Sequence, residues 1–382
     1  AYAGYQGALM APTEVLARQH YNNITALFKE RDIKLNAALL VGSMTALEKK
    51  VVYDALEKGN IHILIGTHAI IQEKVKFREL ALVITDEQHR FGTRQREALS
   101  LKGDQEVPHM MVMSATPIPR TLALILYGDM AVSIIDQVPL NRLPVKNAVV
   151  DSSYHANALR FITKQVKAGH QAYIICPLIE YSEGVAAVNV EDYYEMLREE
   201  MDPSIRIGKI TGKMSSDQKN ETMQKFAEGK VDVLVATTVI EVGVDVPNAT
   251  VMMIEDANRF GLAALHQLRG RVGRGKDQSY CIFVSDNRSE EAMKRLEILN
   301  SSNNGFEIAS KDLEIRGPGE VLGERQSGEL SFNIFDVYTD TDIALKAEKA
   351  VDSILDGSLK ITEAELELLE EKSILKQGGI LL

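Results

Sequence analysis

The chain has 382 residues, of which 45% are hydrophobic and 25% are charged, a composition typical of a soluble protein with room for about two domains. No apolar run is long enough to span a bilayer, and the first residues lack the positively charged start of a signal peptide, so we expect no membrane association. The formal net charge of −11 argues against a simple basic protein that coats DNA. Cys176 and Cys281 lie in apolar stretches, which predicts buried thiols in a reducing cytoplasm.

Short apolar runs alternate with amphipathic helical stretches over the first 287 residues. In the first half the predicted strands are 7–11, 36–41, 61–66, 80–86 and 109–115, and the predicted helices are 13–30, 44–59 and 93–101. In the second half the predicted strands are 145–150, 171–176, 206–211, 231–237, 250–254 and 279–284, and the predicted helices are 154–168, 190–201, 215–228 and 262–272. Apolar strands joined by helical crossovers predict an α/β fold with one parallel sheet in each half.

The stretch 137–144 contains two prolines and no periodicity, so we interpret it as the linker between the halves. After about residue 287 the alternation stops. Residues 288–303 predict a helix, Gly317–Gly319 must interrupt any regular element, and 340–356 and 362–372 predict two acidic helices. The predicted domains are therefore 1–140, 141–287 and 288–382.

Residues 267–274 place three arginines and a glutamine across about two helical turns. Guanidinium groups stay charged and match phosphate oxygens two at a time, so they suit the stabilisation of charge on a transferred phosphoryl group. From Arg259 to Lys276 there are five basic residues and no acidic one. A solvated basic face is the alternative interpretation, and the segment alone does not decide between the two.

Two adjacent carboxylates, Asp86 and Glu87, directly follow the apolar run 80–84. The carboxyl end of a parallel strand is where α/β folds place ligands, so one acid can hold Mg²⁺ while its neighbour activates water. The alternative is an ordinary acidic pair in a loop. The position after a buried strand favours the functional interpretation.

Hydroxyl groups follow two other predicted strands. Ser114 and Thr116 could bond carboxylates or phosphates, but when they are taken alone a capped helix N-terminus is the better explanation. In the second half, Thr237 and Thr238 could bind a backbone phosphate, and Asp245 could accept a hydrogen bond from a ribose hydroxyl. Each of these residues is also a common turn residue.

Several segments resemble the successive motifs of superfamily 2 helicases, in that family's order and spacing: APTE at 11–14, GTHAI at 66–70, DEQH at 86–89, SAT at 114–116, ATTVIEVGVDVP at 236–247 and HQLRGRVGRG at 266–275. Residues 114–124 and 311–328 are similar to the RecG family of branch-migrating DNA translocases. The segment after the second domain resembles the translocation hairpin that this family shares with the transcription-repair coupling factor. The resemblance implies two tandem RecA-like domains of the P-loop NTPase fold, the first one truncated, and a C-terminal helical hairpin and tail.

The resemblance also implies roles for individual residues in an enzyme that uses ATP and Mg²⁺. Asp86 would hold Mg²⁺, Glu87 would activate water, and Arg271 and Arg274 would reach the γ-phosphate from the second domain. Nucleotide contacts would come from Gln88, His89, Gly243, Asp245 and Gln267. DNA contacts would come from Pro12, Thr13, Gly66, Thr67, His68, Thr211, Gly212, Thr237 and Thr238. Coupling of hydrolysis to movement would involve Ser114, Ala115, Thr116, Arg316, Arg325 and Gln326. The implied partner is branched or forked duplex DNA, bound by a monomer in the bacterial cytoplasm during recombination and repair.

One departure from the family's pattern concerns the phosphate-binding loop. No G-x-x-x-x-G-K-[ST] run exists in the chain, which opens at Ala1 without a methionine. We therefore expect a fragment that starts just after this loop, that lacks the family's N-terminal branch-splitting domain, and that is inactive as an ATPase by itself. The alternatives are another superfamily 2 translocase, such as the coupling factor, and a passive nucleic-acid-binding module. The DEQH motif and residues 311–328 disfavour an RNA helicase.

Overall fold

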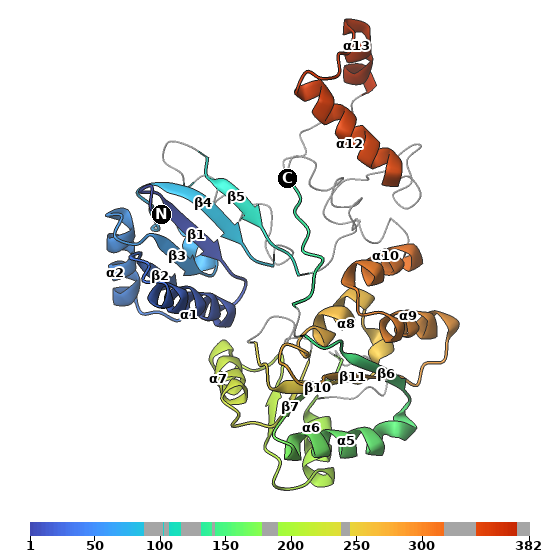
Figure 1. Ribbon diagram of the computed structural model, residues 1–382. Coiled ribbons are helices and arrows are strands. Elements are labelled where there is room, and N and C mark those ends of the chain that lie inside the picture. Colours follow the sequence, from blue (N-terminus) through green and yellow to red (C-terminus); the bar gives the residue numbers. More distant parts are fainter. Residues whose placement is uncertain are drawn as a thin grey trace. The chain divides into compact units, whose positions relative to one another are not determined.

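The computed structural model describes residues 1–87, 102, 107–115, 131–139, 142–177, 190–237, 245–316 and 341–372. The chain divides into two compact units, Ala1–Thr116 with Pro139–Asn303, and Pro117–Val138 with Asn304–Leu382. The first unit contains a five-stranded and a six-stranded sheet. We call these sheets, with their helices, the first lobe (blue to turquoise in Figure 1) and the second lobe (green to orange). The domain boundaries predicted from the sequence stay a prediction.

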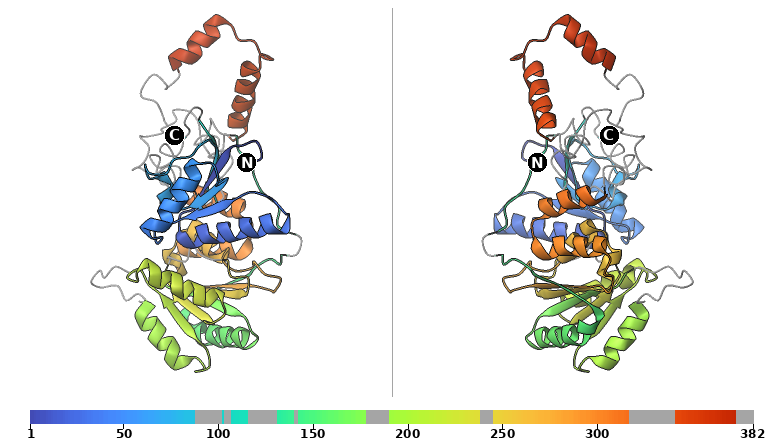
Figure 2. Two further views of the ribbon diagram at one scale, coloured as in Figure 1. Left: turned by 90° about the vertical axis from the view of Figure 1, so that its left-hand side faces the viewer. Right: turned by 90° about the vertical axis from the view of Figure 1, so that its right-hand side faces the viewer.

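The first lobe contains strands β1 Gln6–Met10, β2 Ala37–Leu40, β3 Ile63–Gly66, β4 Leu80–Thr85 and β5 His109–Val112, and helices α1 Glu14–Glu30, α2 Ala46–Glu57 and the 3-10 turn η1 His68–Ile71. All neighbouring strands are parallel, in the order β2-β3-β1-β4-β5. Ala8 and Met10 of β1 pack with Leu56 of α2, while Leu9 packs on the opposite face with Ala17 of α1. After Gln6 the central strand β1 is apolar, because helices cover both faces of the sheet (Figure 2).

The second lobe contains strands β6 Lys146–Val150, β7 Gln171–Ile175, β8 Ile207–Ile210, β9 Val233–Ala236, β10 Ala249–Ile254 and β11 Tyr280–Val284. Its helices are α5 His155–Lys167, α6 Val190–Glu200, α7 Ser216–Ala227, α8 Leu262–Arg269 and α9 Glu290–Ser301, with 3-10 turns η3 Ser152–Tyr154 and η5 Ala257–Arg259. The strands are again parallel, in the order β6-β11-β10-β7-β9-β8. The predicted parallel sheets are confirmed in both lobes.

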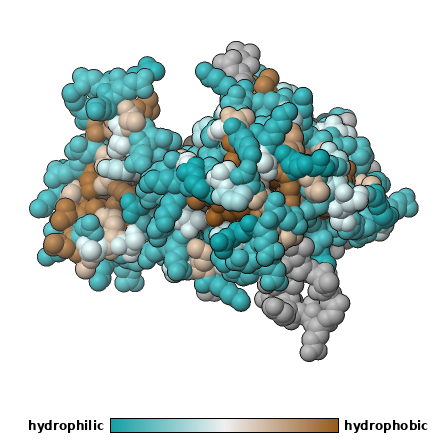
Figure 3. Space-filling view, turned by 90° about the horizontal axis from the view of Figure 1, so that it is seen from below, coloured by the Kyte–Doolittle hydropathy of each residue, from teal (hydrophilic) through white to brown (hydrophobic). Residues whose placement is uncertain are grey.

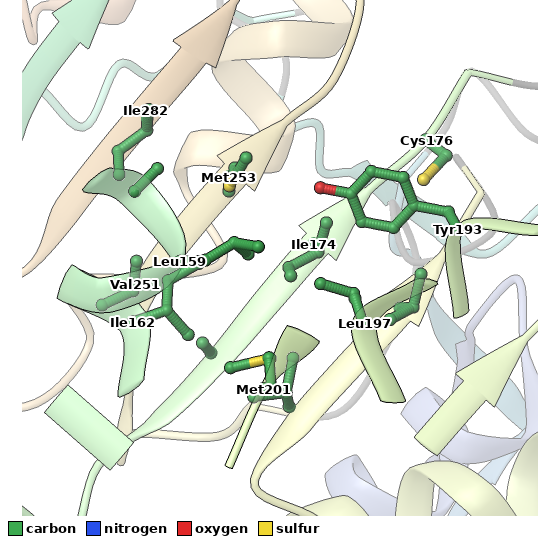
Figure 4. Packing of buried hydrophobic residues seen from close by; sticks show 14 of the residues in the cluster. Leu159, Ile162, Ile174, Cys176, Tyr193, Leu197, Met201, Val251, Met253 and Ile282 are labelled. Atoms are coloured by element: carbon green, nitrogen blue, oxygen red, sulfur yellow. The ribbon is translucent and has the colours of Figure 1, made fainter. Parts of the chain in front are cut away.

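One face of the second sheet is closed by α5 and α6. Figure 4 shows Leu159 of α5 and Leu197 of α6 pointing toward Ile174 of β7 and Met253 of β10. Each of these side chains is at most 6% exposed. Successive side chains of a strand point to opposite faces of the sheet. The residues next to these in each strand therefore face the other side.

A polar cluster is built into the carboxyl end of this core. The Tyr193 hydroxyl donates to Glu255 Oε1 at 2.7 Å, and His155 Nε2 lies 3.1 Å from the same oxygen. The hydrogen bond with Glu255 raises the pKa of His155, and burial raises the pKa of Tyr193 well above its usual range. The cluster ties α5 and α6 to the end of β10.

The two lobes repeat one local design. Thr45 caps the start of α2 and forms reciprocal hydrogen bonds with Glu48. Ser215, 170 residues later, caps α7 with the same bonds to Gln218. The central strands start alike as well. The Gln6 amide donates to the carbonyl oxygens of Leu56 and Ile61, just as the Gln171 amide donates to those of Phe226 and Val231. These buried amides fasten the end of one helix to its sheet in each lobe.

The second compact unit includes helices α10 Gly305–Arg316, α12 Thr341–Leu355 and α13 Glu363–Lys372. The predicted helices 340–356 and 362–372 are confirmed. The predicted helix 93–101 and most of the hairpin-like segment 311–328 lie outside the described residues. Where predicted elements of the two lobes fall on described residues, no bound differs from the structure by more than three residues.

The surface and the thiols agree with the composition. The face drawn in Figure 3 is mostly hydrophilic, with apolar residues between polar ones. Cys176 and Cys281 are buried free thiols, as predicted. Within the residues that the structure describes, no helix has the length and apolar character needed to cross a membrane.

Candidate functional site

The two predicted catalytic acids lie at the carboxyl end of β4, between β1 and β5. The Asp86 amide donates to the Met10 carbonyl oxygen of β1 at 2.9 Å, so the sheet's hydrogen bonding extends into the acidic pair. Glu87 has a φ of 53°, in the left-handed region that costs a residue with a side chain about 1–2 kcal/mol. Backbone strain in a non-glycine residue just beyond a strand of a parallel sheet is typical of a functional site.

The side chains of these acids contact two other segments of the first lobe. Asp86 Oδ2 lies 2.9 Å from Nε2 of His20, which projects from α1. Glu87 Oε2 accepts a hydrogen bond from the Ala115 amide at 3.4 Å. The second contact joins the acidic pair to the Ser114–Ala115 segment that the sequence predicts as a coupling element. His20 was missed by sequence reasoning, because it is 66 residues away from its partner.

The acidic pair is compatible with the predicted Mg²⁺ ion. Magnesium in nucleotide sites is bound through one or two carboxylates together with substrate phosphates and water, so a full cage of protein ligands is not needed. Among the described residues no group of three His, Cys, Asp or Glu side chains is placed to hold a metal. Asp86, whose side chain is 18% exposed and bonded to His20 through Oδ2, retains a second carboxylate oxygen that fits this mode of binding.

Four of the predicted DNA contacts are threonines that lie just beyond parallel strands: Thr13, Thr67, Thr211 and Thr237. Within each sheet the carboxyl ends of parallel strands share one edge, so the threonines of each lobe lie along that edge. Thr67 and Thr237 are only 4% and 5% exposed, and their hydroxyl oxygens have no hydrogen-bond partner among the described residues. Orphaned buried hydroxyls are uncommon, and a phosphate oxygen would satisfy them.

Other residues of this set have local structural roles. The Thr13 hydroxyl accepts a hydrogen bond from the Leu16 amide at 3.3 Å and begins α1, next to Pro12. At Gly66 a Cβ atom would meet the Leu40 carbonyl oxygen at 2.0 Å, so packing alone requires glycine there. His68 is exposed on η1.

In the second lobe the loop after β8 is held in place by a lysine. The Gly212 carbonyl oxygen accepts a hydrogen bond from Lys219 of α7 at 3.1 Å. The first lobe repeats this bond between Lys49 and the Gly42 carbonyl oxygen at 2.8 Å. The loop that carries Thr211 therefore has a fixed backbone in the second lobe.

The arginine-rich segment 267–274, which we call the arginine motif, contains residues with two different roles. Arg269, at the end of α8, is 3% exposed, and its guanidinium donates to the carbonyl oxygens of Leu299 and Ser302 at 3.1 and 2.7 Å. It therefore caps the end of α9 and serves the fold. Gln267, on the same helix, is half-buried. The alternative of a solvated basic face does not describe this helix end.

Arg271 and Arg274 follow α8 in an irregular loop. Burial lowers the pKa of Arg271, and the neighbouring Arg274 lowers it further. Arg274 Nη1 lies 3.5 Å from Asp245 Oδ1, so the structure brings together two of the predicted site residues. Gly273, with a φ of 77°, makes the turn between them. The charge of Arg274 is therefore felt at Arg271. Two neighbouring guanidinium groups repel each other, and a bound anion such as a phosphate would offset this repulsion.

The linker contributes to this loop. Arg142, within the predicted linker 137–144, donates through Nε to the Gly273 carbonyl oxygen at 2.6 Å. This contact fixes the backbone between Arg271 and Arg274. Sequence reasoning missed it, since a linker arginine carries no signal of its partner.

Seven predicted site residues lie outside the described residues: Gln88, His89, Thr116, Thr238, Gly243, Arg325 and Gln326. Arg316 is the last residue of α10. The roles of all predicted site residues stay predictions.

Comparison with known families agrees with the arrangement of the lobes. The DEAD/DEAH box helicase model matches residues 1–125, the helicase conserved C-terminal domain matches 155–276, and domain 3, C-terminal, of ATP-dependent DNA helicase RecG matches 302–377. Two parallel α/β lobes with these matches define the core of a superfamily 2 helicase.

Individual relatives show which helicases this chain resembles. ATP-dependent DNA helicase RecG of Bacillus subtilis (strain 168) is 45% identical over 98% of this chain and 54% of its own length. The protein of that name from Staphylococcus aureus (strain Mu50) is 49% identical over 88% of this chain and 48% of its own length. A solved structure of RecG bound to a three-way DNA junction has 43% identity and a TM-score of 0.72, covering 89% of this chain and 44% of that one. The chain is therefore similar to RecG proteins over almost its whole length, and it spans about half the length of the curated relatives it matches.

Proposed function

We propose that the protein represented by this chain is an ATP-dependent DNA helicase of the RecG type, which remodels branched DNA such as stalled forks and Holliday junctions in recombination and repair. The similarity to proteins named ATP-dependent DNA helicase RecG, over 98% of the chain in one case, is the observation that carries this proposal. The solved relative that is bound to a three-way DNA junction supports branched duplex DNA as the partner.

In the proposed mechanism the first lobe activates water and the second stabilises the transferred phosphoryl group. Glu87 accepts a proton from the attacking water. Asp86 would hold Mg²⁺ through a carboxylate oxygen, and the bound ion would offset phosphate charge. Arg271 and Arg274 donate to the γ-phosphate oxygens as negative charge develops there. Such an arginine accelerates phosphoryl transfer by about 10³–10⁵ where it has been measured. Gln88, His89, Gly243, Asp245 and Gln267 complete the nucleotide contacts.

The carboxyl edges of the two sheets bind the DNA backbone in this proposal. The hydroxyl groups of Thr67 and Thr237, buried and without partners among the described residues, donate hydrogen bonds to phosphate oxygens in this proposal. Thr13 and Thr211 lie at corresponding strand ends. Contacts of this kind position the protein on DNA without recognising its sequence. The remaining predicted contacts, Pro12, Gly66, His68, Gly212 and Thr238, flank these four threonines in the sequence.

Coupling of hydrolysis to movement is assigned to two further segments. Ser114–Thr116 follows β5, and the Ala115 amide contacts the acid proposed to activate water. Arg316, Arg325 and Gln326 belong to the hairpin-like segment, which in this proposal transmits nucleotide state to the duplex.

The direct test is a fork-regression assay on a form of the protein that includes the family's phosphate-binding loop. Conversion of a model fork to a four-way junction, dependent on ATP and Mg²⁺, is the expected result. A protein that unwinds only simple partial duplexes contradicts the RecG assignment. Displacement of a stalled RNA polymerase instead of fork regression favours the coupling factor. Mass photometry on the same sample tests the proposed monomer, which we place in the bacterial cytoplasm.

The chain by itself is proposed to be inactive as an ATPase, since it contains no G-x-x-x-x-G-K-[ST] run to hold the β- and γ-phosphates. No ATP turnover is expected from the purified chain with or without branched DNA. Turnover that Glu87→Gln abolishes would refute this part of the proposal. DNA binding without turnover is the behaviour expected of a passive module, and it describes the isolated chain only.

A further inference from the structure

A histidine of α1 lies against the acid proposed to hold Mg²⁺. His20 Nε2 is 2.9 Å from Asp86 Oδ2, and the two side chains are 25% and 18% exposed. An ionised carboxylate only accepts hydrogen bonds, so Nε2 carries the proton in this contact. Among the described residues, no other side chain bonds the Asp86 carboxylate.

The fold does not depend on this hydrogen bond. Helix α1 begins at the Thr13 cap and packs on the sheet through Leu16, Ala17 and Ile24. The main chain of Asp86 is held separately by its amide bond to β1. Partly exposed pairs of this kind contribute little to stability. The main consequence of the contact is therefore the orientation of a carboxylate.

We propose that His20 is a positioning residue for Asp86, an inference that rests on the proposed function. By donating to Oδ2, His20 fixes the rotation of the carboxylate and leaves Oδ1 for Mg²⁺, either directly or through water. Hydrogen-bonding partners outside the metal's own ligands set ligand orientation and basicity in this way in many metal sites.

The experiment compares four variants in a form of the protein that hydrolyses ATP. His20→Leu removes the donor, and His20→Asn keeps a polar side chain that is too short to reach Asp86. His20→Gln places an amide donor close to the position of Nε2. His62→Leu is the matched control, because His62 lies in the same lobe and loses one hydrogen bond, from the Asn36 amide.

Two quantities are measured: the Mg²⁺ concentration for half-maximal ATP turnover, and Mn²⁺ binding with ATP present, followed by electron paramagnetic resonance. His20→Leu and His20→Asn are expected to weaken metal binding about 10–100-fold, the usual effect of losing such a partner. His20→Gln and His62→Leu are expected to stay close to the unsubstituted protein, with the KM for ATP unchanged throughout.

Each result either supports or overturns the proposed role of His20. Unchanged Mn²⁺ affinity in His20→Leu overturns it, as does an equal loss in His20→Gln, which would indicate packing instead of donation. If circular dichroism shows that His20→Leu does not fold, His20→Asn decides in the same way. A fifth variant, Asp86→Asn, tests the proposed function separately from the positioning role of His20. If it leaves turnover intact, the proposed function fails; if it abolishes turnover while His20→Leu and His20→Asn behave normally, only the positioning role fails.

Discussion

Arg269 tests whether the arginine motif contains a purely structural residue beside the arginines proposed to bind the nucleotide. Its sequence neighbours are the arginines proposed to reach the nucleotide, yet its guanidinium is buried and caps α9 through the carbonyl oxygens of Leu299 and Ser302. We predict that Arg269→Met destabilises the second lobe. The perturbation keeps an unbranched apolar side chain and removes only the charged donor group.

The magnitude follows from the two hydrogen bonds that are lost. Bonds to a charged group contribute about 1.5–3 kcal/mol each, so two contribute about 3–6 kcal/mol. Removing a buried cation recovers part of its desolvation cost, and burial does lower the pKa of Arg269. We therefore expect a net loss of at least about 2 kcal/mol. With a urea dependence of about 2 kcal/mol per molar, the unfolding midpoint falls by about 1 M or more.

Urea unfolding of the purified chain, followed by far-ultraviolet circular dichroism, measures this loss; the chain has no tryptophan for fluorescence. Arg160→Met is the matched control, because Arg160 is exposed and, within the described part of the chain, bonds only atoms of its own helix. It is expected to change stability by no more than about 0.5 kcal/mol. If the Arg269 and Arg160 variants unfold at the same urea concentration, the capping role of Arg269 is wrong.

Four further predictions concern single residues. In a form of the protein that hydrolyses ATP, Arg274→Ala is expected to lower kcat by about 10³–10⁵, equivalent to about 4–7 kcal/mol, with little change in unfolding, and near-normal turnover removes it from the site. Glu87→Gln is expected to abolish turnover while fluorescent-nucleotide binding persists; turnover at the normal rate excludes Glu87 as the base. Because the pKa of His155 is raised in the folded state, its stabilisation is fully present below the usual value of 6.5 and lost as pH rises through the raised pKa, so His155→Gln should lower the melting temperature at pH 5.5 more than at pH 9. Gly66→Ala forces a Cβ against a carbonyl oxygen 2.0 Å away, so the purified first lobe should lose most of its protection from hydrogen exchange.

The sequence predicts the sheets well because the inner strands, such as β7 and β9, are buried on both faces. A run such as Ile63–Gly66 is apolar at every position, which distinguishes it from the amphipathic helix α2 that precedes it. The predicted start of a helix is less accurate where a capping residue precedes it. The predicted helix 44–59 begins two residues later, at Ala46, since Thr45 caps it instead of joining it.

The site is less predictable because it depends on contacts between distant residues. The positions of Asp86 and Glu87 follow from a strand that ends there. The partner of Asp86, His20, comes from a helix whose sequence gives no indication of which side chain faces the sheet edge. Similarly, Arg269 and Arg274 look alike in the sequence. Only the packing of α8 against α9 shows that the first points inward while the second reaches Asp245.

The repeated design of the lobes extends to the acids themselves. Strand β10 flanks the central strand of its sheet as β4 does, and Glu255 and Asp256 follow β10 as Asp86 and Glu87 follow β4. The Glu255 amide bonds β7 at 2.8 Å, just as the Asp86 amide bonds β1. The second acid of each pair has a left-handed φ, 45° at Asp256 and 53° at Glu87. The backbone is therefore equivalent in both lobes, and any difference in chemistry must come from the side chains.

The side chains give the two positions different environments, and this leads to a last prediction. Glu255 is 7% exposed, and one of its oxygens already contacts both His155 and the Tyr193 hydroxyl. Asp86 is more exposed and contacts His20 alone among the described side chains. Glu255→Gln should therefore destabilise the second lobe by about 1–3 kcal/mol, the cost of disturbing a buried hydrogen-bonded group, without lowering ATP turnover per folded molecule. Asp86→Asn should do the reverse. Melting temperatures and kcat measured on both variants test this, and loss of turnover in stably folded Glu255→Gln would show that the acids of both lobes take part in catalysis.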